Sequence, residues 1–434
     1  MQKMDATPHE TRGHGLAETS APFWLTARRL RAHATILSVC LWTLYVWNLA
    51  TPGLRDRNRN LKGTDFLHFY TMGSLAEWRD AADLYDMNAQ TAVSTERVPQ
   101  AAGLRYLPLY PPQVSILFEP FAHLSYGWAL ALWWGCSALL YTVSCFSVWR
   151  ACPNLQPHGF TVFLLALAFP AFFHLIAWGQ CSALALACFT LAFFLLRAKC
   201  EFLTGVVLGS LIFKPQLALA AAVIFLSIGA WKTVVGAILS SAAQLWLGVL
   251  YYGTAPLHQW IVTLRHLPIV VPWLEPRPYQ THSLRTFWTM LVPWPDAALV
   301  MYIVSAISVL ALTIAVWRAK SAPLALRYSC LLVATVLVAP HLTVYDVVIL
   351  APALLLSANW LVEQPAHSSN RMLGTLLYFV YMLPLVGPLA RWTHLQLSVI
   401  AMAACLYLLW RASGIEYAPA KGTVAAEVPS VQFK

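Results

Sequence analysis

Charged residues are scarce in this sequence. Lys, Arg, Asp and Glu make up 11% of the 434 residues, 59% are hydrophobic, and the mean hydropathy is +0.61. A soluble domain carries about 25% charged residues, so the composition excludes a set of soluble domains. The net charge of +10 does not indicate nucleic-acid binding, because the basic residues cluster at the ends of hydrophobic runs. The sequence predicts one all-α, polytopic integral membrane domain over residues 33–411.

The short motifs of several enzyme classes are also missing. The nine cysteines form no C-x-x-C pair and no metal-ligand spacing, so we expect neither a disulfide framework nor a metal site. No nucleophile elbow, P-loop or H-E-x-x-H motif is present. Residues 1–22 carry no apolar signal-peptide core. The first apolar run, at about 33–51, is long enough to remain in the bilayer as an anchor.

Basic residues set the expected topology. Arg28, Arg29 and Arg31 precede the first span and place residues 1–32 in the cytoplasm. Two external loops follow, at 52–111 and 253–295, and residues 412–434 are expected to form a disordered cytoplasmic tail. Residues 113–149 should contain a short interfacial helix and then a crossing from Tyr126. The other spans are expected at about 159–177, 181–196, 233–252, 297–317, 322–339, 345–361, 372–389 and 394–411.

Residues 202–229 leave two topologies open. This apolar stretch is interrupted by Lys214 and Pro215, and proline breaks a helix because it removes a hydrogen bond and clashes with the preceding turn. If the stretch crosses once, the later basic clusters fall outside. If it forms a hairpin with Lys214 near its outer tip, they are all cytoplasmic, as the positive-inside rule favours. The hairpin gives twelve helical passes with both termini inside.

The first external loop is the most acidic part of the chain and holds the candidate base, Asp65. Seven of the eighteen acidic residues lie there: Asp56, Asp65, Glu77, Asp80, Asp83, Asp86 and Glu96. Asp65 precedes an aromatic stretch that includes His68 and Tyr70, both candidate substrate-binding residues. We expect an interfacial amphipathic helix here, with Asp65, Phe69, Met72 and Trp78 around it. Among aromatic rings, a carboxyl pKa should rise toward useful base strength. The alternative is that Asp65 only caps the helix.

Other polar residues have two interpretations each. Tyr106 and Tyr110 could form the wall of a sugar or phosphate site, or an interfacial aromatic belt. Gln180, in a tight turn after Gly179, could join a site or simply face water. Lys214 lies in an apolar stretch, where a cation is functional by default, and a lipid phosphate would suit it; the alternative is that it snorkels to the interface.

Two later segments supply further candidates. Residues 280–285 read Gln-Thr-His-Ser-Leu-Arg, in which Gln280, His282 and Arg285 are candidate ligands, and an arginine can clamp a phosphate with two hydrogen bonds. His341, Tyr345 and Asp346 lie where one span ends and the next begins, and the four-residue spacing of His341 and Tyr345 would place both on one helix face.

The order of these segments resembles glycosyltransferase family 87, membrane enzymes of the GT-C fold whose known members resemble mannosyltransferases using polyprenyl-phosphate mannose. The shared elements are D-F-x-x-F-Y after the first span, Y-x-x-x-Y-P-P, G-Q at a turn, G-x-x-x-G-x-x-x-x-K-P, Q-x-x-S-L-R and P-H-x-x-x-Y-D. The resemblance covers about residues 60–360.

The resemblance implies an inverting, single-displacement transfer of a sugar from a polyprenyl-phosphate donor to a glycolipid or glycan hydroxyl, at the outer face of the bacterial inner membrane. It implies that Asp65 is the base and that His341 lies near the donor phosphate or sugar. Arg285, Lys214 and His341 could offset the phosphate charge, and no metal or other cofactor is expected. Family members often have Asn-Gln before Ser-Leu, where this chain has Thr-His, which bears on acceptor or sugar specificity.

Three other classes of protein fit part of the pattern. A secondary transporter would use the broken helix and the buried lysine, but here the polar residues collect near the first loop rather than at mid-membrane. A lipid-linked polymerase or ligase would carry its richest loop late in the chain. An envelope scaffold would leave the acidic cluster without a purpose.

Overall fold

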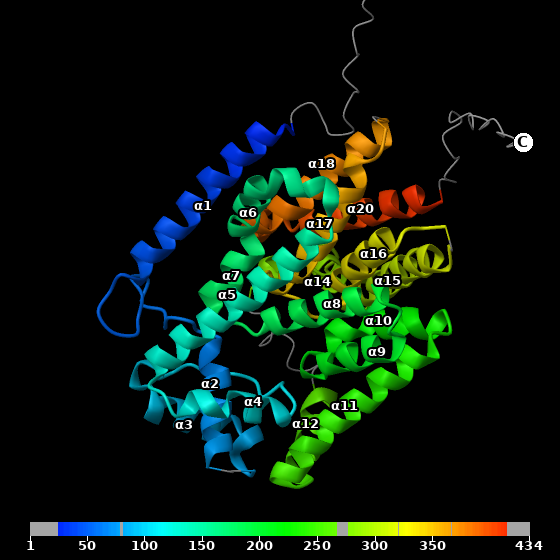
Figure 1. Ribbon diagram of the computed structural model, residues 1–434. Helices are drawn as coiled ribbons and strands as arrows, with labels where there is room; N and C mark the ends of the chain where they lie inside the picture. The colour runs from blue at the N-terminus through cyan, green and yellow to red at the C-terminus, as the bar shows by residue number, and fades with distance from the viewer. Residues whose placement is uncertain (1–24, 79–80, 267–276, 320, 366, 415–434) are drawn as a thin grey trace, which may run out of the picture.

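The computed structural model describes residues 25–78, 81–266, 277–319, 321–365 and 367–414. These parts are helical, and their only β-type pairings are two isolated bridges, Arg55 with Leu61 and Thr281 with Thr343. Figure 1 shows the helices packed into one bundle, with a smaller group of helices from the first loop at one end. Most of the expected N-terminal segment and C-terminal tail lie outside the described residues.

Five helical segments are long and apolar enough to cross a membrane within the described residues. They are α1 (Ala27–Leu49), α5 (Tyr126–Arg150), α11 (Trp231–Tyr252), α15 (Pro295–Arg318) and the segment Ser368–Thr393, which comprises α18 (Ser368–Met382), η7 (Leu383–Leu389) and α19 (Ala390–Thr393). A sixth span arises if η3 (Pro153–His158) and α6 (Gly159–Leu167) are joined to α7 (Pro170–Trp178) across their 45° bend. The chain is therefore a helical, polytopic membrane protein; twelve passes stay a prediction.

The remaining expected spans are shorter apolar helices. They are α8 (Ser182–Arg197), α9 (Glu201–Gly209) with η4 (Ser210–Phe213), α10 (Pro215–Ser227), α16 (Leu324–Val338), η6 (Asp346–Leu350) with α17 (Ala351–Val362), and α20 (Leu397–Ser413). Helix α16 is central, because it packs against α10, α15, α17 and α20. Its residues from Tyr328 to Val338 are all buried, as expected of a helix that is apolar on every side.

The first loop folds into short helices, and one of them begins directly after Asp65. The amphipathic character expected of this helix is wrong, whereas its position at the membrane interface stays a prediction. This part contains α2 (Phe66–Glu77), η1 (Asp83–Tyr85), α3 (Met87–Arg97), η2 (Pro99–Ala101) and α4 (Gln113–Ala122). Eleven of the twelve residues of α2 are buried, the polar residues His68, Thr71 and Ser74 among them, so the helix leaves no face exposed to water. Helix α4 packs so closely on α2 that a Cβ at Gly73 would lie 2.4 Å from the Phe118 carbonyl oxygen.

The break at Lys214 reverses the chain. Near the start of α9 the Glu201 carbonyl accepts a hydrogen bond from Thr233, and near its end the Gly209 carbonyl accepts one from Ser241. Helices α9 and α11 therefore run in the same direction, and α10 must return between them. This arrangement is a helical hairpin whose bend lies at Lys214; which side of a membrane the bend faces stays a prediction.

The second loop also contains short helical segments. It contains α12 (Ala255–Arg265), η5 (Pro278–Gln280) and α14 (Leu284–Leu291). Figure 1 shows α12 beside the first-loop helices, and the Trp260 indole donates a hydrogen bond to the Leu109 carbonyl at 2.9 Å.

Candidate active site

Asp65 stands at the start of α2, but its side chain does not cap that helix. Its backbone N–H donates to the Trp178 carbonyl at 2.9 Å, which joins the first loop to the end of α7. Its carboxylate Oδ2 accepts a hydrogen bond of 2.7 Å from the Gln180 side-chain amide. The capping interpretation is therefore correct for the position of Asp65 and wrong for its side chain.

Gln180 lies at the centre of a polar network and does not face water. It is 6% exposed and follows Gly179, whose φ of +71° is a left-handed conformation that glycine adopts readily. The amide nitrogen also donates to the Tyr345 hydroxyl at 3.2 Å. The amide oxygen accepts from Tyr110 and Lys214 at 3.4 Å each, and from the Cys181 backbone at 3.2 Å.

Lys214 and Asp346 form a buried ion pair beside Gln180. The ammonium lies 2.7 Å from Asp346 Oδ1, and the two side chains are 5% and 2% exposed. Lys214 also donates to Ser182 Oγ at 3.1 Å, and Ser182 donates to Asp346 at 2.5 Å. Snorkelling is therefore wrong for Lys214. The anion that it contacts in the structure is a protein carboxylate, whereas the sequence suggested a lipid phosphate.

Three aromatic side chains form a cluster near Asp65. The His68 ring is buried, one turn along α2, with the Tyr106 and Tyr110 rings each 5.6 Å from it. Neither ring nitrogen of His68 has a hydrogen-bond partner among the described residues, and burial lowers its pKa to about 4, so the ring is neutral at pH 7. The Tyr106 hydroxyl donates to the Thr64 carbonyl at 2.6 Å.

The surroundings raise the pKa of the Asp65 carboxyl. Burial raises the pKa of its carboxyl to about 6; the Gln180 hydrogen bond and the Lys214 charge oppose that rise, and the Asp346 charge adds to it. At pH 7 the carboxylate is mostly ionised, yet its pKa lies close to the working pH, which is the condition a general base needs. No described residue donates a hydrogen bond to Asp65 Oδ1, so this oxygen can accept one from a substrate.

The later candidates form a second group, joined to the first through the backbone. The Val344 N–H donates to the Gln280 carbonyl at 2.9 Å, and the His282 N–H donates to the Leu342 carbonyl at 3.0 Å. Arg285 donates to the Pro340 carbonyl at 3.2 Å. These bonds tie residues 280–285 of the second loop to residues 340–344, the segment that immediately precedes Tyr345 and Asp346 in the chain. This part of the second loop therefore lies beside the start of that pair of residues.

The comparison with known protein families decides the class. The family model of Glycosyltransferase family 87 matches residues 109–340, which is more than half of the chain. The chain belongs to glycosyltransferase family 87. No curated protein and no solved structure matches it. The resemblance is thus confirmed at the level of the family, and the protein is a membrane glycosyltransferase.

The candidate residues of this family 87 enzyme separate into four sets. The structure joins six of them in one hydrogen-bonded network: Asp65, Tyr110, Gln180, Lys214, Tyr345 and Asp346. His68 and Tyr106 flank this network, and Gln280, His282, Arg285 and His341 lie in the adjoining loops. The His282 ring faces α20, where Nδ1 lies 2.7 Å from Ser398 Oγ. Tyr70 lies apart, since its hydroxyl donates to the Leu124 carbonyl.

Sequence reasoning missed two residues of the network. Ser182 bridges both members of the ion pair, and Thr343 donates to Asp346 Oδ2 from its backbone and its hydroxyl, at 3.4 and 3.3 Å. Hydroxyl residues are common in apolar helices and turns, where they bond to the local backbone, so neither position stood out. The closeness of Ser182 to Gln180 in the chain was the one usable signal.

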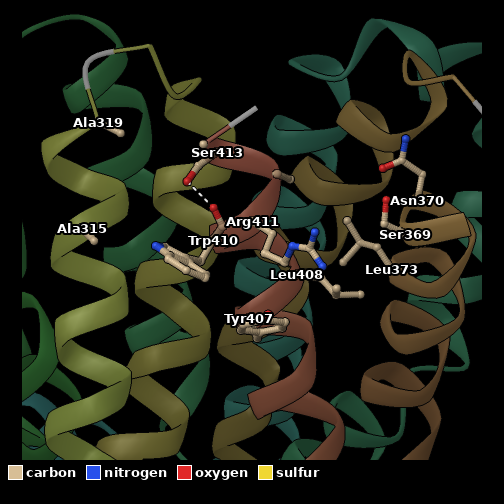
Figure 2. A pocket seen from close by; sticks show the side chains of 12 residues that line it. Ala315, Ala319, Ser369, Asn370, Leu373, Tyr407, Leu408, Trp410, Arg411 and Ser413 are labelled. Atoms are coloured by element: carbon tan, nitrogen blue, oxygen red, sulfur yellow. Dashed lines mark hydrogen bonds between the residues drawn. The ribbon is translucent and has the colours of Figure 1, made fainter. Parts of the chain in front are cut away.

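A separate cleft of about 450 Å³ lies at the other end of the bundle, between α15, α18 and α20. Figure 2 shows Arg411 extending from α20 toward Leu373 and Ser369 of α18. Helix α16 begins near this cleft and ends before the loop that carries Asp346. Its fifteen residues span about 22 Å at 1.5 Å per residue, so the cleft is distinct from the Asp65 site.

Proposed function

We propose that this family 87 enzyme moves a sugar, mannose by the resemblance, from a polyprenyl-phosphate donor to a hydroxyl of a glycolipid or glycan. Asp65 is the general base. The observation that carries this assignment is the environment of the Asp65 carboxyl. One oxygen accepts a hydrogen bond from Gln180, and the other accepts none from the described residues. Burial raises the pKa of this carboxyl to about 6. The neighbouring aromatic residues give a sugar ring surfaces to pack against.

The reaction is a single displacement. Asp65 Oδ1 accepts the proton of the acceptor hydroxyl while the hydroxyl oxygen attacks the anomeric carbon of the donor sugar. The bond from that carbon to the phosphate oxygen breaks, and polyprenyl phosphate leaves with the electron pair. Attack from the side opposite the leaving group inverts the anomeric configuration, and no covalent glycosyl-enzyme forms.

The leaving phosphate needs nearby positive charge. Arg285 and His341 lie in the two loops tied together beside Tyr345, and they are the proposed contacts of the donor phosphate. Lys214 already neutralises Asp346, so its net contribution to the phosphate is smaller. Gln280 and His282 stay proposed contributors to sugar or acceptor binding. We also propose that transfer requires no metal.

The site is proposed to face the outside of the bacterial inner membrane, with both chain termini in the cytoplasm. Helices α8 and α10 begin at Ser182 and Pro215 beside the site, and they end at Arg197 and at Ser227, whose carbonyl accepts from Arg318. Basic residues at that far end fit the positive-inside rule.

Basic residues that follow α1, on the Asp65 side of the molecule, have local partners instead. Arg57 donates to the Trp47 carbonyl, and Lys62 donates to the carbonyls of Thr51 and Gly53. These bonds fold the loop between α1 and α2, so they give those side chains a structural role on the proposed outer side.

A transfer assay tests the proposal. Purified enzyme in lipid nanodiscs is offered polyprenyl-phosphate mannose, polyprenyl-phosphate glucose or GDP-mannose, each with a membrane glycolipid extract as acceptor. We expect transfer from a polyprenyl-phosphate sugar and none from the nucleotide sugar, and NMR of the product should show an inverted anomeric centre. Transfer from GDP-mannose alone, or a retained configuration, would contradict the proposal.

A further inference from the structure

We propose that Gln180 is a positioning residue for Asp65 and that the Lys214–Asp346 pair sets the direction in which its amide points. This inference rests on the proposed function, because it concerns how the base is held. It also differs from the sequence expectation, in which Gln180 and Lys214 contact the substrate. Here both act on Asp65, and neither has to touch the sugar.

The amide group of Gln180 has one orientation that suits its neighbours. Its NH₂ faces the Asp65 carboxylate at 2.7 Å, and its oxygen faces the Lys214 ammonium at 3.4 Å. A flipped amide would place its oxygen against the carboxylate and its NH₂ against the ammonium, so both contacts would become repulsive. The side chain is 6% exposed, so water cannot easily replace the lost bonds.

The ion pair keeps the cation where Gln180 needs it. Lys214 is held by Asp346 and Ser182, and Asp346 is held in turn by Thr343. These groups come from η6 and the residues just before it, and from the starts of α8 and α10, which are separate elements of the bundle. The buried Lys214–Asp346 pair therefore fixes the Gln180 amide, and the amide in turn fixes the Asp65 carboxylate.

Other groups around Asp65 do not supply a second charge-assisted hydrogen bond. The titratable residues that interact with it are Tyr106, Tyr126, Tyr345, Lys214 and Asp346. His68 lies one turn along α2, and Tyr110 is joined to the site through Gln180. The tyrosines and His68 are neutral near pH 7, since burial raises the pKa of Tyr106 and Tyr110 and lowers that of His68. Gln180 is the one described side chain that donates to the carboxylate.

The consequence is measurable as a pH profile. Removing the amide donor leaves burial as the main influence on Asp65, so its pKa should rise. A charge-assisted hydrogen bond accounts for about one to two pH units. We expect Gln180→Leu to move the acidic limb of kcat upward by that amount, to lower transfer at pH 7 several-fold, and to recover most of the wild-type rate by pH 9.

Gln180→Glu provides a second test with the shape of the side chain kept. The new carboxylate retains a partner for Lys214, but it offers Asp65 no donor and adds a like charge. Its acidic limb should move at least as far as that of Gln180→Leu. Gln90→Leu is the matched control, because Gln90 is a buried glutamine on α3 that donates to the Leu84 carbonyl. This control should leave the acidic limb in place.

The outcomes separate the inference from the proposed function. Asp65→Asn is measured in the same series, and thermal unfolding of each variant verifies its fold. If Asp65→Asn loses transfer while both Gln180 variants keep the wild-type acidic limb, the positioning role is wrong and Asp65 remains the base. A loss of rate in the Gln180 variants that is equal at every pH would also overturn the inference. Full transfer by Asp65→Asn would overturn both claims.

Discussion

The buried pair of Lys214 and Asp346 makes a quantitative prediction about stability. Breaking such a pair by removing one partner leaves the other charge buried and uncompensated, which costs about 3–5 kcal/mol. Both side chains are at most 5% exposed and their charged atoms are 2.7 Å apart, so the full range applies here. We expect Lys214→Met to destabilise the protein by about 4 kcal/mol. Asp346→Asn should cost about 3 kcal/mol, the lower end of the range, since the asparagine oxygen can still accept the Ser182 hydrogen bond.

The double variant tests whether the charges act as a pair. With Lys214→Met and Asp346→Asn together no buried charge remains, and Ser182 can still bond to residue 346. We expect a total loss of no more than about 3 kcal/mol, so the double-mutant cycle should give a coupling energy of at least roughly 4 kcal/mol. The assay is unfolding in mixed detergent and SDS micelles, followed by tryptophan fluorescence. Additive losses, or a cost below about 1 kcal/mol for Lys214→Met, would refute the reasoning.

Two further predictions concern packing and pH. Gly73→Val should destabilise the protein by about 1–3 kcal/mol or more, because its Cβ would lie 2.4 Å from the Phe118 carbonyl oxygen. A Cβ at Gly135 on α5 meets nothing within 4 Å, so Gly135→Ala should be harmless. Thermal unfolding compares the two variants, and equal effects would contradict the tight α2–α4 contact. Burial lowers the pKa of His282 to about 3, below the 6.5 of an unfolded chain, so its stabilising contribution is complete above pH 6.5 and is lost as the pH falls toward 3. His282→Gln should therefore unfold with a shallower dependence on pH in this window, and an unchanged dependence would contradict the burial of a neutral ring.

Local signals in the sequence located the helices well. The start of α5 at Tyr126 and the break at Lys214–Pro215 were both predicted, since a proline or a change in hydropathy affects the backbone only within a few residues of its position. The helix after Asp65 was wrongly predicted to be amphipathic, because the spacing of apolar residues does not show how much of a helix is covered by its neighbours. Helix α2 is covered on every side, by α4 above all.

The partners within the site could not be read from the chain. Lys214 meets a carboxylate 132 residues further on, and Gln180 meets one 115 residues earlier. Such contacts depend on how the bundle closes, which periodicity and spacing do not encode. The order of the motifs did mark six residues that the fold brings into one network, but it assigned substrate contacts to Gln180 and Lys214, whose visible partners are protein carboxylates.

The most direct test of the account is the rate of sugar transfer by Asp65→Asn beside Asp86→Asn. Asp86 is the matched control, because it lies in the same loop and caps α3 through bonds to the N–H groups of Asn88 and Ala89, a role that asparagine can keep. We expect Asp65→Asn to lower kcat by about 10²–10⁴ with unchanged binding of polyprenyl-phosphate mannose, and Asp86→Asn to stay near wild type. Transfer by Asp65→Asn at the wild-type rate would contradict the assignment of Asp65 as the base.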